Sequence, residues 1–260
     1  MNPLLMKIAR DTVSISKNRK YNLKGKEIKL PNTKDSILIT TIERTDILYN
    51  DIQENKKQFK EKIEIRAEGT VDTIFYSNSE NLGVLNFASA RHPGGGFLNG
   101  AIAQEECLAY CSTLYADQLN SPYYTINANN KSKFYTDTMI VSETTFFRDS
   151  KYNLIEDLQT CFVITCPAVN MKIAKNTPEA KQVMKDRMRK ILDVFIKYNI
   201  KNLVLGAYGC GVFGNLATDV AKNWRDLLIE EGYIRFFDKI YFSIPGGKNL
   251  KDFKVILEKE

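Results

Sequence analysis

The chain has 260 residues, enough for one sizeable α/β domain with an accessory segment but short for two full domains. Hydrophobic residues make up 43% of the chain, which suffices for a conventional core and excludes global disorder. The net charge of +6 favours anionic ligands such as phosphates and nucleotides, although surface lysines often serve only solvation.

The cysteine and histidine content argues against a zinc site. The chain has 5 cysteines and 1 histidine, and no two cysteines form a C-x-x-C pair. Cys107 and Cys111 are spaced to share a helix face, where we expect them to be small buried thiols. The N-terminus has no signal-peptide pattern, and no apolar run is long enough to span a membrane. We therefore expect a soluble, reduced, cytoplasmic protein with no metal and no membrane partner.

Apolar spacing and turn residues predict five elements in the first part of the chain. They are a helix over residues 3–16, a lysine-rich, turn-like stretch over 16–29, a strand over 36–42, a charged helix over 46–62 and a strand over 62–67.

From residue 71 onward, short apolar runs alternate with helical patterns. The expected helices are 71–78, 104–120, 178–198 and 215–231, and the expected strands are 83–88, 138–142, 161–166, 203–206 and 239–244. Such alternation predicts an α/β sandwich, a three-layer α/β/α fold with a parallel or mixed central sheet. Ligands in these sheets bind where loops leave the carboxyl ends of strands, so the residues directly after each strand are the ones that indicate function.

The first informative strand exit is LNFASARHPGGGFLNGAIAQEE, residues 85–106. Pro93 stiffens the chain, Gly94, Gly95 and Gly96 expose bare backbone, and Gly100 precedes a helix. Consecutive glycines let N–H groups approach a ligand, and a helix N-terminus attracts negative charge, so both features suit a diphosphate. The stretch is neither a Walker loop nor G-x-G-x-x-G, and a purely structural turn remains an alternative.

Gln104, Glu105 and Glu106 open the helix after these glycines. Acidic residues in a first helical turn often only complement the helix dipole. Adjacent residues on a helix point about 100° apart, however, so one carboxyl can face a cleft while the other secures backbone or ribose.

The second strand exit is LVLGAYGCGVFGN, residues 203–215. Gly206, Gly209, Gly211 and Gly214 lie in a loop between a strand and a helix, with Phe213 among them, where it can cover a ligand. Two glycine-rich loops of this kind can grip one diphosphate from both sides.

These motifs resemble the poly(ADP-ribose) glycohydrolases. PGGGFLNGAIAQEE is similar to their GGG-x(6–8)-QEE signature, with a spacing of seven residues here. LNFASARHPGGG, TCPAVN (165–170) and LGAYGCGVFGN together resemble the bacterial-type branch. The similarity extends from about Arg10 to Ile244; it departs at Tyr208, where tryptophan is expected and an aromatic ring is retained.

The resemblance implies a macrodomain with a mixed central sheet. It implies a mainly helical accessory extension over residues 1–65 and a catalytic domain over 66–260. It makes Glu106 the catalytic acid and Glu105 a ribose-positioning partner. The implied substrate-binding residues are Asn86 at the distal ribose, the catalytic loop Gly94–Gly96, Gln104, and the diphosphate loop Gly209, Cys210, Gly211, Val212 and Phe213.

The implied reaction is hydrolysis of the ribose–ribose O-glycosidic bond, without metal or cofactor. The implied ligands are ADP-ribose, poly(ADP-ribose) and ADP-ribosylated proteins, bound by a monomer. The main alternative is a non-hydrolytic ADP-ribose reader, because fold alone does not decide function. The intact Gln104-Glu105-Glu106 favours the enzyme, since a reader needs no acid.

Three further features leave alternatives open. A nucleic-acid partner is disfavoured because candidate lysines alternate with acidic residues and form no basic stripe; the residues concerned are Lys172, Lys175, Lys181, Lys185, Glu179 and Asp186.

Aromatic residues after the Glu106 helix either stack on adenine or pack in the core; they are Tyr123, Tyr124, Phe134 and Tyr135. Polymer against mono(ADP-ribose), and exo against endo cleavage, are left open.

Overall fold

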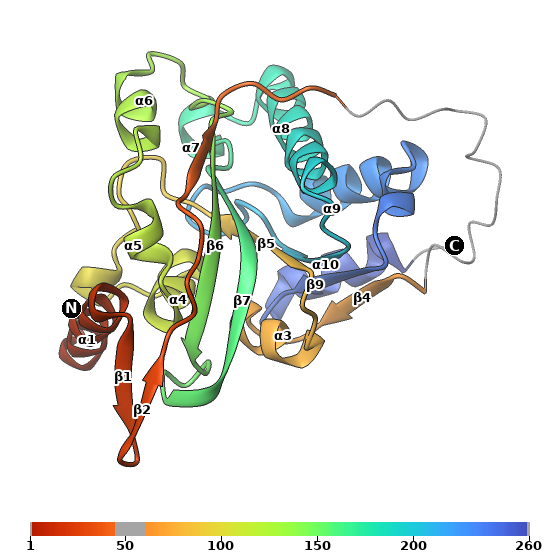
Figure 1. The fold of residues 1–260 in the computed structure, drawn as a ribbon. Helices are drawn as coiled ribbons and strands as arrows, with labels where there is room; N and C mark the ends of the chain where they lie inside the picture. Colours follow the sequence, from red (N-terminus) through yellow and green to blue (C-terminus); the bar gives the residue numbers. More distant parts are fainter. Residues whose placement is uncertain (1, 45–60, 259–260) are drawn as a thin grey trace.

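A mixed sheet forms the centre of the protein (Figure 1). The computed structural model describes residues 2–44 and 61–258. Within them, the sheet has seven strands in the order β3-β6-β7-β5-β8-β9-β4. Their bounds are β3 Ile37–Ile39, β4 Ile63–Arg66, β5 Leu82–Phe87, β6 Met139–Arg148, β7 Leu154–Cys166, β8 Asn202–Gly206 and β9 Lys239–Ser243. The pairs of β5 with β7 and β8, and of β9 with β8 and β4, are parallel. The pairs of β6 with β3 and β7 are antiparallel.

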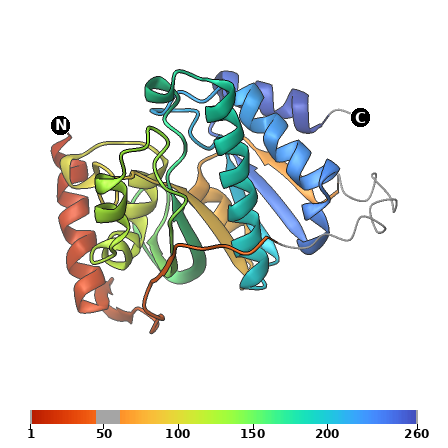
Figure 2. The same cartoon turned by 90° about the horizontal axis from the view of Figure 1, so that it is seen from above.

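Helices cover both faces of the sheet and make three layers (Figure 2). One face packs against α8 (Pro178–Lys197), α9 (Ala217–Arg225) and α10 (Gly247–Leu257). The other packs against α1 (Pro3–Asn18), α3 (Thr70–Ser77) and α4 (Gln104–Cys111), with α5 (Leu114–Gln118) beside them. Two short helices, α6 (Tyr123–Asn129) and α7 (Met171–Ala174), lie in the connections.

The interior strand β8 has apolar side chains on both sides because helices cover each face of the sheet. In β8, Leu203 and Leu205 belong to the core under α8 and α9, whereas Val204 belongs to the core under α3 and α4. The twofold alternation of strand side chains explains this division. It also explains why the sequence shows continuous apolar runs here instead of alternating ones.

The parallel strands bring their carboxyl ends to one edge of the sheet. The registers pair Phe87 with Cys166, and Gly206 with Ser243. The loops after β5, β7, β8 and β9 therefore begin side by side. Most of the candidate residues lie in these loops or at the starts of the next helices.

Several element predictions are confirmed and several are corrected. The helices over 3–16, 71–78 and 178–198 are present, and so are the predicted strands. β6 and β7 are longer than predicted, and β3 is shorter. The predicted helix over 104–120 is broken at Ser112, which forms a β-bridge to Phe146. The predicted helix over 215–231 begins at Ala217 and ends in a π-helical turn, Asp226–Glu230.

The stretch predicted as turn-like over 16–29 is a β-hairpin, which is a correction. Its strands are β1 (Lys20–Leu23) and β2 (Lys26–Lys29). Lys24 and Gly25 both have positive φ, as a two-residue hairpin turn requires, and Asn22 accepts a hydrogen bond from the Gly25 N–H. Polar or charged residues occupy five of the eight strand positions, so the strands carry little apolar signal.

The accessory extension over residues 1–65 stays a prediction as a separate unit. It holds α1 and the hairpin, but β3 pairs with β6 inside the central sheet. The helix predicted over 46–62 lies outside the described residues, except for 61 and 62, which form a turn. Among the described helices, none has the length and apolar character needed to cross a bilayer.

Gly83 in β5 is a packing constraint that can be tested. A Cβ at this position would lie 2.5 Å from Phe195 Cε1 and 2.7 Å from Ile200 Cγ2. We predict that Gly83→Ala lowers the free energy of unfolding by about 1–3 kcal/mol through overpacking, measured by urea denaturation. Gly211→Ala is the matched control, because no heavy atom lies within 4 Å of its added Cβ. Equal stabilities of the two variants would contradict the prediction.

Candidate functional site

A pocket of about 940 Å³ lies at the carboxyl edge of the parallel strands. Its wall is built from the loops after β4, β5, β7, β8 and β9, together with the first turn of α4. This is where ligands bind in open α/β sheets, and the volume suits a dinucleotide-sized ligand.

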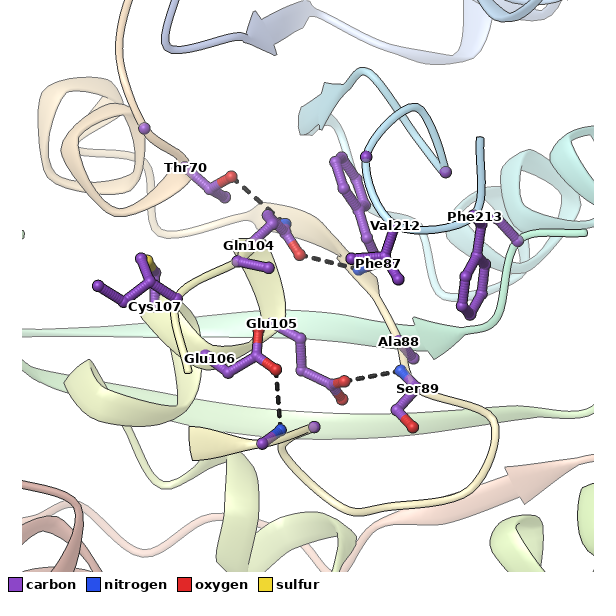
Figure 3. A pocket seen from close by; sticks show the side chains of 18 of the residues that line it. Thr70, Phe87, Ala88, Ser89, Gln104, Glu105, Glu106, Cys107, Val212 and Phe213 are labelled. Carbon is purple, nitrogen blue, oxygen red and sulfur yellow. Dashed lines mark hydrogen bonds between the residues drawn. The ribbon is translucent and has the colours of Figure 1, made fainter. Parts of the chain in front are cut away.

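The glycine loop after β5 passes directly against two carboxyl groups (Figure 3). Gly94 and Gly95 have φ of +61° and +60°, a region that side chains disfavour. A Cβ on Gly95 would lie 2.3 Å from Glu106 Oε1 and 3.2 Å from Glu105 Oε2. The Gly96 N–H donates to Glu106 Oε1 at 2.8 Å. A residue with a side chain at position 95 would be disfavoured by the positive φ and would push against the Glu106 carboxyl.

Glu105 points into the protein and Glu106 toward the glycine loop. The Glu105 side chain is buried, and its two oxygens accept hydrogen bonds from Asn86 Nδ2 at 3.1 Å and from the Ser89 N–H at 2.6 Å. Burial raises the pKa of Glu105 to about 8, although these two hydrogen bonds act in the opposite direction. The Glu105 carboxyl is therefore mostly protonated at neutral pH.

Gln104 joins the start of α4 to the end of β5. Its Nε2 donates to the Leu85 carbonyl at 2.9 Å, and its Oε1 accepts from the Phe87 N–H at 2.9 Å (Figure 3). The Gln104 side chain therefore pairs with one backbone C=O and one backbone N–H of β5, as the backbone of a neighbouring strand would. This pair of hydrogen bonds to the backbone fixes where Glu105 and Glu106 enter the pocket.

The loop after β8 supplies the opposite wall. Gly209 has φ of +74°, and a Cβ there would lie 2.6 Å from the Ala168 Cβ. Gly211 instead faces open space, with no heavy atom within 4 Å of an added Cβ. Phe213 lines the pocket, and its ring centroid lies 6.0 Å from that of Tyr135. A bare backbone at Gly211 and an aromatic ring at Phe213 thus face the same space.

Comparison with known proteins gives the family. The family model described as microbial-type PARG, catalytic domain, matches residues 9–149, more than half of the chain. The chain belongs to this family. PARG is the abbreviation of poly(ADP-ribose) glycohydrolase. A search of the curated proteins finds no match.

Solved structures agree with the family assignment. The poly(ADP-ribose) glycohydrolase of Thermomonospora curvata bound to the inhibitor ADP-HPD is 28% identical, with a TM-score of 0.84 over 98% of this chain and 99% of that one. The Deinococcus radiodurans enzyme in complex with ADP-ribose is 32% identical, with a TM-score of 0.71 over 86% of this chain and 94% of that one. The predicted three-layer, macrodomain-like fold is thereby confirmed.

Most of the predicted site residues line the one pocket. They are Gly95, Gly96, Gln104, Glu105, Glu106, Gly209, Gly211, Val212 and Phe213. Three others do not line it. Asn86 is fully buried behind Glu105, Gly94 is the buried first residue of the glycine loop, and the Cys210 thiol points to the Tyr208 carbonyl. Burial raises the pKa of Cys210 to about 12, so this thiol stays protonated.

The position of Asn86 changes the role expected for it. The sequence predicts a direct contact with ribose hydroxyls, but the side chain has no exposed surface, and its amide donates to Glu105. Asn86 therefore supports Glu105 in this structure, and its contact with ribose stays a prediction. Tyr123 and Tyr124 are also buried, which agrees with core packing, the alternative to adenine stacking for these two residues.

Some pocket residues are not among those predicted from the sequence. Ile244, Pro245 and Gly246 come directly after β9 and line the pocket, and Gly246 has φ of +129°. This is a third strand exit with glycines, so the criterion that identifies the first two loops also applies to it. Thr70 and Tyr115 line the pocket as well, but no local pattern marks them.

The burial of Glu105 predicts a pH-dependent stability. A carboxyl whose pKa is raised from 4.5 to about 8 on folding binds its proton more tightly in the folded state. Its contribution is therefore fully present below about pH 4.5 and is lost as pH rises toward about 8, by at most about 1.4 kcal/mol per pH unit. Relative to Glu105→Gln, which cannot ionise, the wild type should lose stability between pH 5 and pH 8.

Urea denaturation at several pH values measures this difference. The matched control is Glu106→Gln, in which Glu105 keeps its burial and its contacts with Asn86 and Ser89, so the stability of this variant should still fall between pH 5 and pH 8. A pH-independent difference between the wild type and Glu105→Gln would refute the buried, protonated state.

Proposed function

We propose that this chain hydrolyses the ribose–ribose O-glycosidic bond of poly(ADP-ribose) and releases ADP-ribose. The observation that carries the proposal is the placement of Glu106 against the Gly96 N–H, in a pocket whose opposite wall is a second glycine-rich loop. The similar Deinococcus protein is a poly(ADP-ribose) glycohydrolase in complex with ADP-ribose, which supports the ligand class.

Glu106 is the proposed general acid and base. Its carboxyl gives a proton to the leaving 2′-oxygen while the bond from that oxygen to the anomeric carbon breaks. The oxocarbenium-like ribose then accepts water at the anomeric carbon, and the proton of that water returns to Glu106. The hydrogen bond from Gly96 to Oε1 holds the carboxyl in place and leaves Oε2 for the substrate. No step of this mechanism uses a metal or cofactor.

Glu105 is the proposed ribose-positioning partner. Because burial keeps its carboxyl protonated at neutral pH, it adds no full negative charge beside Glu106 or beside the anionic substrate. Its contacts with Asn86 and Ser89 hold it rigidly at the end of β5. A rigid neutral group can orient a sugar hydroxyl without repelling the diphosphate.

The loop from Gly209 to Phe213 is the proposed diphosphate site. Gly211 offers open space beside the backbone, which allows phosphate oxygens to approach N–H groups closely. Phe213 lines the same wall and would pack against the distal ribose. We further propose that the protein acts as a cytoplasmic monomer and that ADP-ribosylated proteins present its substrate.

Glu106→Gln separates hydrolysis from binding. The amide oxygen can still accept from Gly96, but the variant has no acid, so kcat for release of ADP-ribose should fall at least about 100-fold. Affinity for ADP-ribose should stay within about threefold, measured by calorimetry. A wild-type protein that binds ADP-ribose but releases none from the polymer would instead be a reader, and the proposal would fail.

Gly211→Ala tests the diphosphate loop. The residue is not in the positive-φ region and its surroundings are open, so the free energy of unfolding should not change. A methyl group at this point would keep the phosphate from the backbone, and we expect ADP-ribose affinity to fall about tenfold, or about 1.4 kcal/mol. Unchanged affinity in the calorimeter would place the diphosphate elsewhere.

A further inference from the structure

Gln118, the last residue of α5, forms hydrogen bonds with three residues beneath the pocket wall. Its side chain is fully buried, and its Nε2 donates to Thr165 Oγ1 of β7 at 2.9 Å. Its Oε1 accepts from the Gly94 N–H at 2.8 Å and from the Tyr124 hydroxyl at 3.0 Å. Gln118 does not line the pocket, so it acts on the site through these neighbours and through its side-chain interaction with Glu105, which opposes the rise in the pKa of that carboxyl.

These contacts continue to the carboxyl pair. Thr165 Oγ1 also accepts from Asn86 Nδ2 at 3.2 Å, and the same amide donates to Glu105 Oε1 at 3.1 Å. Glu105 is bonded in the chain to Glu106, which accepts from the Gly96 N–H at 2.8 Å. Gly96 is two residues from Gly94, whose N–H donates to Gln118. The result is a closed ring of hydrogen bonds and chain that we call the site ring: Gln118, Thr165, Asn86, Glu105, Glu106, Gly96 and Gly94.

The glycine loop depends on such anchors. Gly94 and Gly95 adopt left-handed conformations and carry no side chains that could pack to hold them. Backbone hydrogen bonds, such as Gly95 N–H to His92 O and Ala101 N–H to Gly96 O, shape the loop itself. Two hydrogen bonds to side chains tie it to the rest of the site: Gly94 N–H to Gln118 and Gly96 N–H to Glu106. Asn86, Gln118 and Thr165 have no exposed surface, so water cannot replace a lost partner without rearrangement.

We propose that Gln118 is a positioning residue for the hydrolysis, holding the glycine loop at a set distance from the carboxyls of Glu105 and Glu106. This inference rests on the proposed function. Although Gln118 lies outside the pocket wall, its substitution should lower kcat, because the site ring sets the position of Glu106 relative to the Gly96 N–H.

Gln118→Glu and Gln118→Met test the proposal through the pH profile of kcat. A protonated glutamic acid is nearly isosteric with glutamine: its O–H can donate to Thr165 and its carbonyl can accept from Gly94 and Tyr124. Once ionised, it loses the donor and puts a charge beside Glu105. The kcat of Gln118→Glu should therefore approach the wild-type value at pH 5 and fall about 10- to 100-fold below it at pH 8 to 9. Gln118→Met should be reduced by a similar factor at every pH.

The other titratable groups around this position are present in the wild type and in both variants, so the ratio of variant to wild-type kcat isolates residue 118. They are Glu105, Glu106, His92, Tyr115, Asp117, Tyr123 and Tyr124. Burial raises the pKa of Asp117, the chain neighbour of Gln118, to about 6, so this group titrates within the measured range in all three proteins. KM for the polymer and Kd for ADP-ribose should stay within about threefold, because no pocket-lining group is changed. A Gln118→Glu ratio that does not vary with pH would overturn the proposal.

Tyr124→Phe is the matched control. It removes one buried hydrogen bond to the same Gln118 oxygen but leaves the bonds to Gly94 and Thr165. We expect a lower Tm and a kcat within about twofold of the wild type. If Tyr124→Phe loses as much kcat as Gln118→Met, the effect of Gln118 is general stability and the proposal is wrong.

Amide hydrogen exchange distinguishes failure of this inference from failure of the proposed function. Gln118→Met should accelerate exchange at Gly96 as well as at Gly94, since both anchors belong to the site ring. Accelerated exchange at Gly96, in a protein whose wild type releases no ADP-ribose, would overturn the hydrolysis but keep the positioning. Unchanged exchange at Gly96 would overturn the positioning whatever the activity.

Discussion

The close approach of the Gly95 backbone to two carboxyl groups is the constraint on which the site depends. An added Cβ would lie 2.3 Å from Glu106 Oε1, so no other residue can occupy this position without moving the acid. Gln104 holds the start of α4 against the end of β5, and the Tyr110 hydroxyl of the same helix donates to the Phe97 and Ala101 carbonyls beside the glycine loop. The end of β5 thus fixes the position of α4, and α4 fixes the positions of the two carboxyl groups. The glycine loop packs directly against these carboxyls.

The two glutamates show how adjacent residues of one type acquire different chemistry. Glu105 is directed to the buried end of β5, where desolvation keeps its proton on at neutral pH. Glu106 is turned to the glycine loop and the open pocket. A neutral neighbour removes the like-charge repulsion that a pair of carboxylates would impose on an anionic substrate.

Much of the fold and of the pocket could be predicted because the signals are local. The stripe of α8 and the apolar runs of β5, β7 and β8 are contiguous in sequence, and the glycines after β5 and β8 mark both loops. The β1–β2 hairpin could not be predicted in this way, because five of its eight strand positions are polar or charged and its strands have no continuous apolar run. The loop after β9 carries the same glycine signal as the other two, so its place in the pocket wall was within reach of the sequence although it was not predicted.

The support beneath the site could not be predicted, because its partners are far apart in sequence. Asn86 meets Thr165 across 79 positions, and Gln118 meets Thr165 across 47. Each is a common polar residue without any local pattern, and only the strand order brings them together. Adjacency predicted that Glu105 and Glu106 face different ways, but it could not say which is buried. The Asn86 amide and the Ser89 N–H at the end of β5 determine which one is buried, because both donate hydrogen bonds to the carboxyl on the inner side of α4, which is that of Glu105. The protonation of Glu105 is therefore set by its place at the sheet edge, and the helix sequence alone does not determine it.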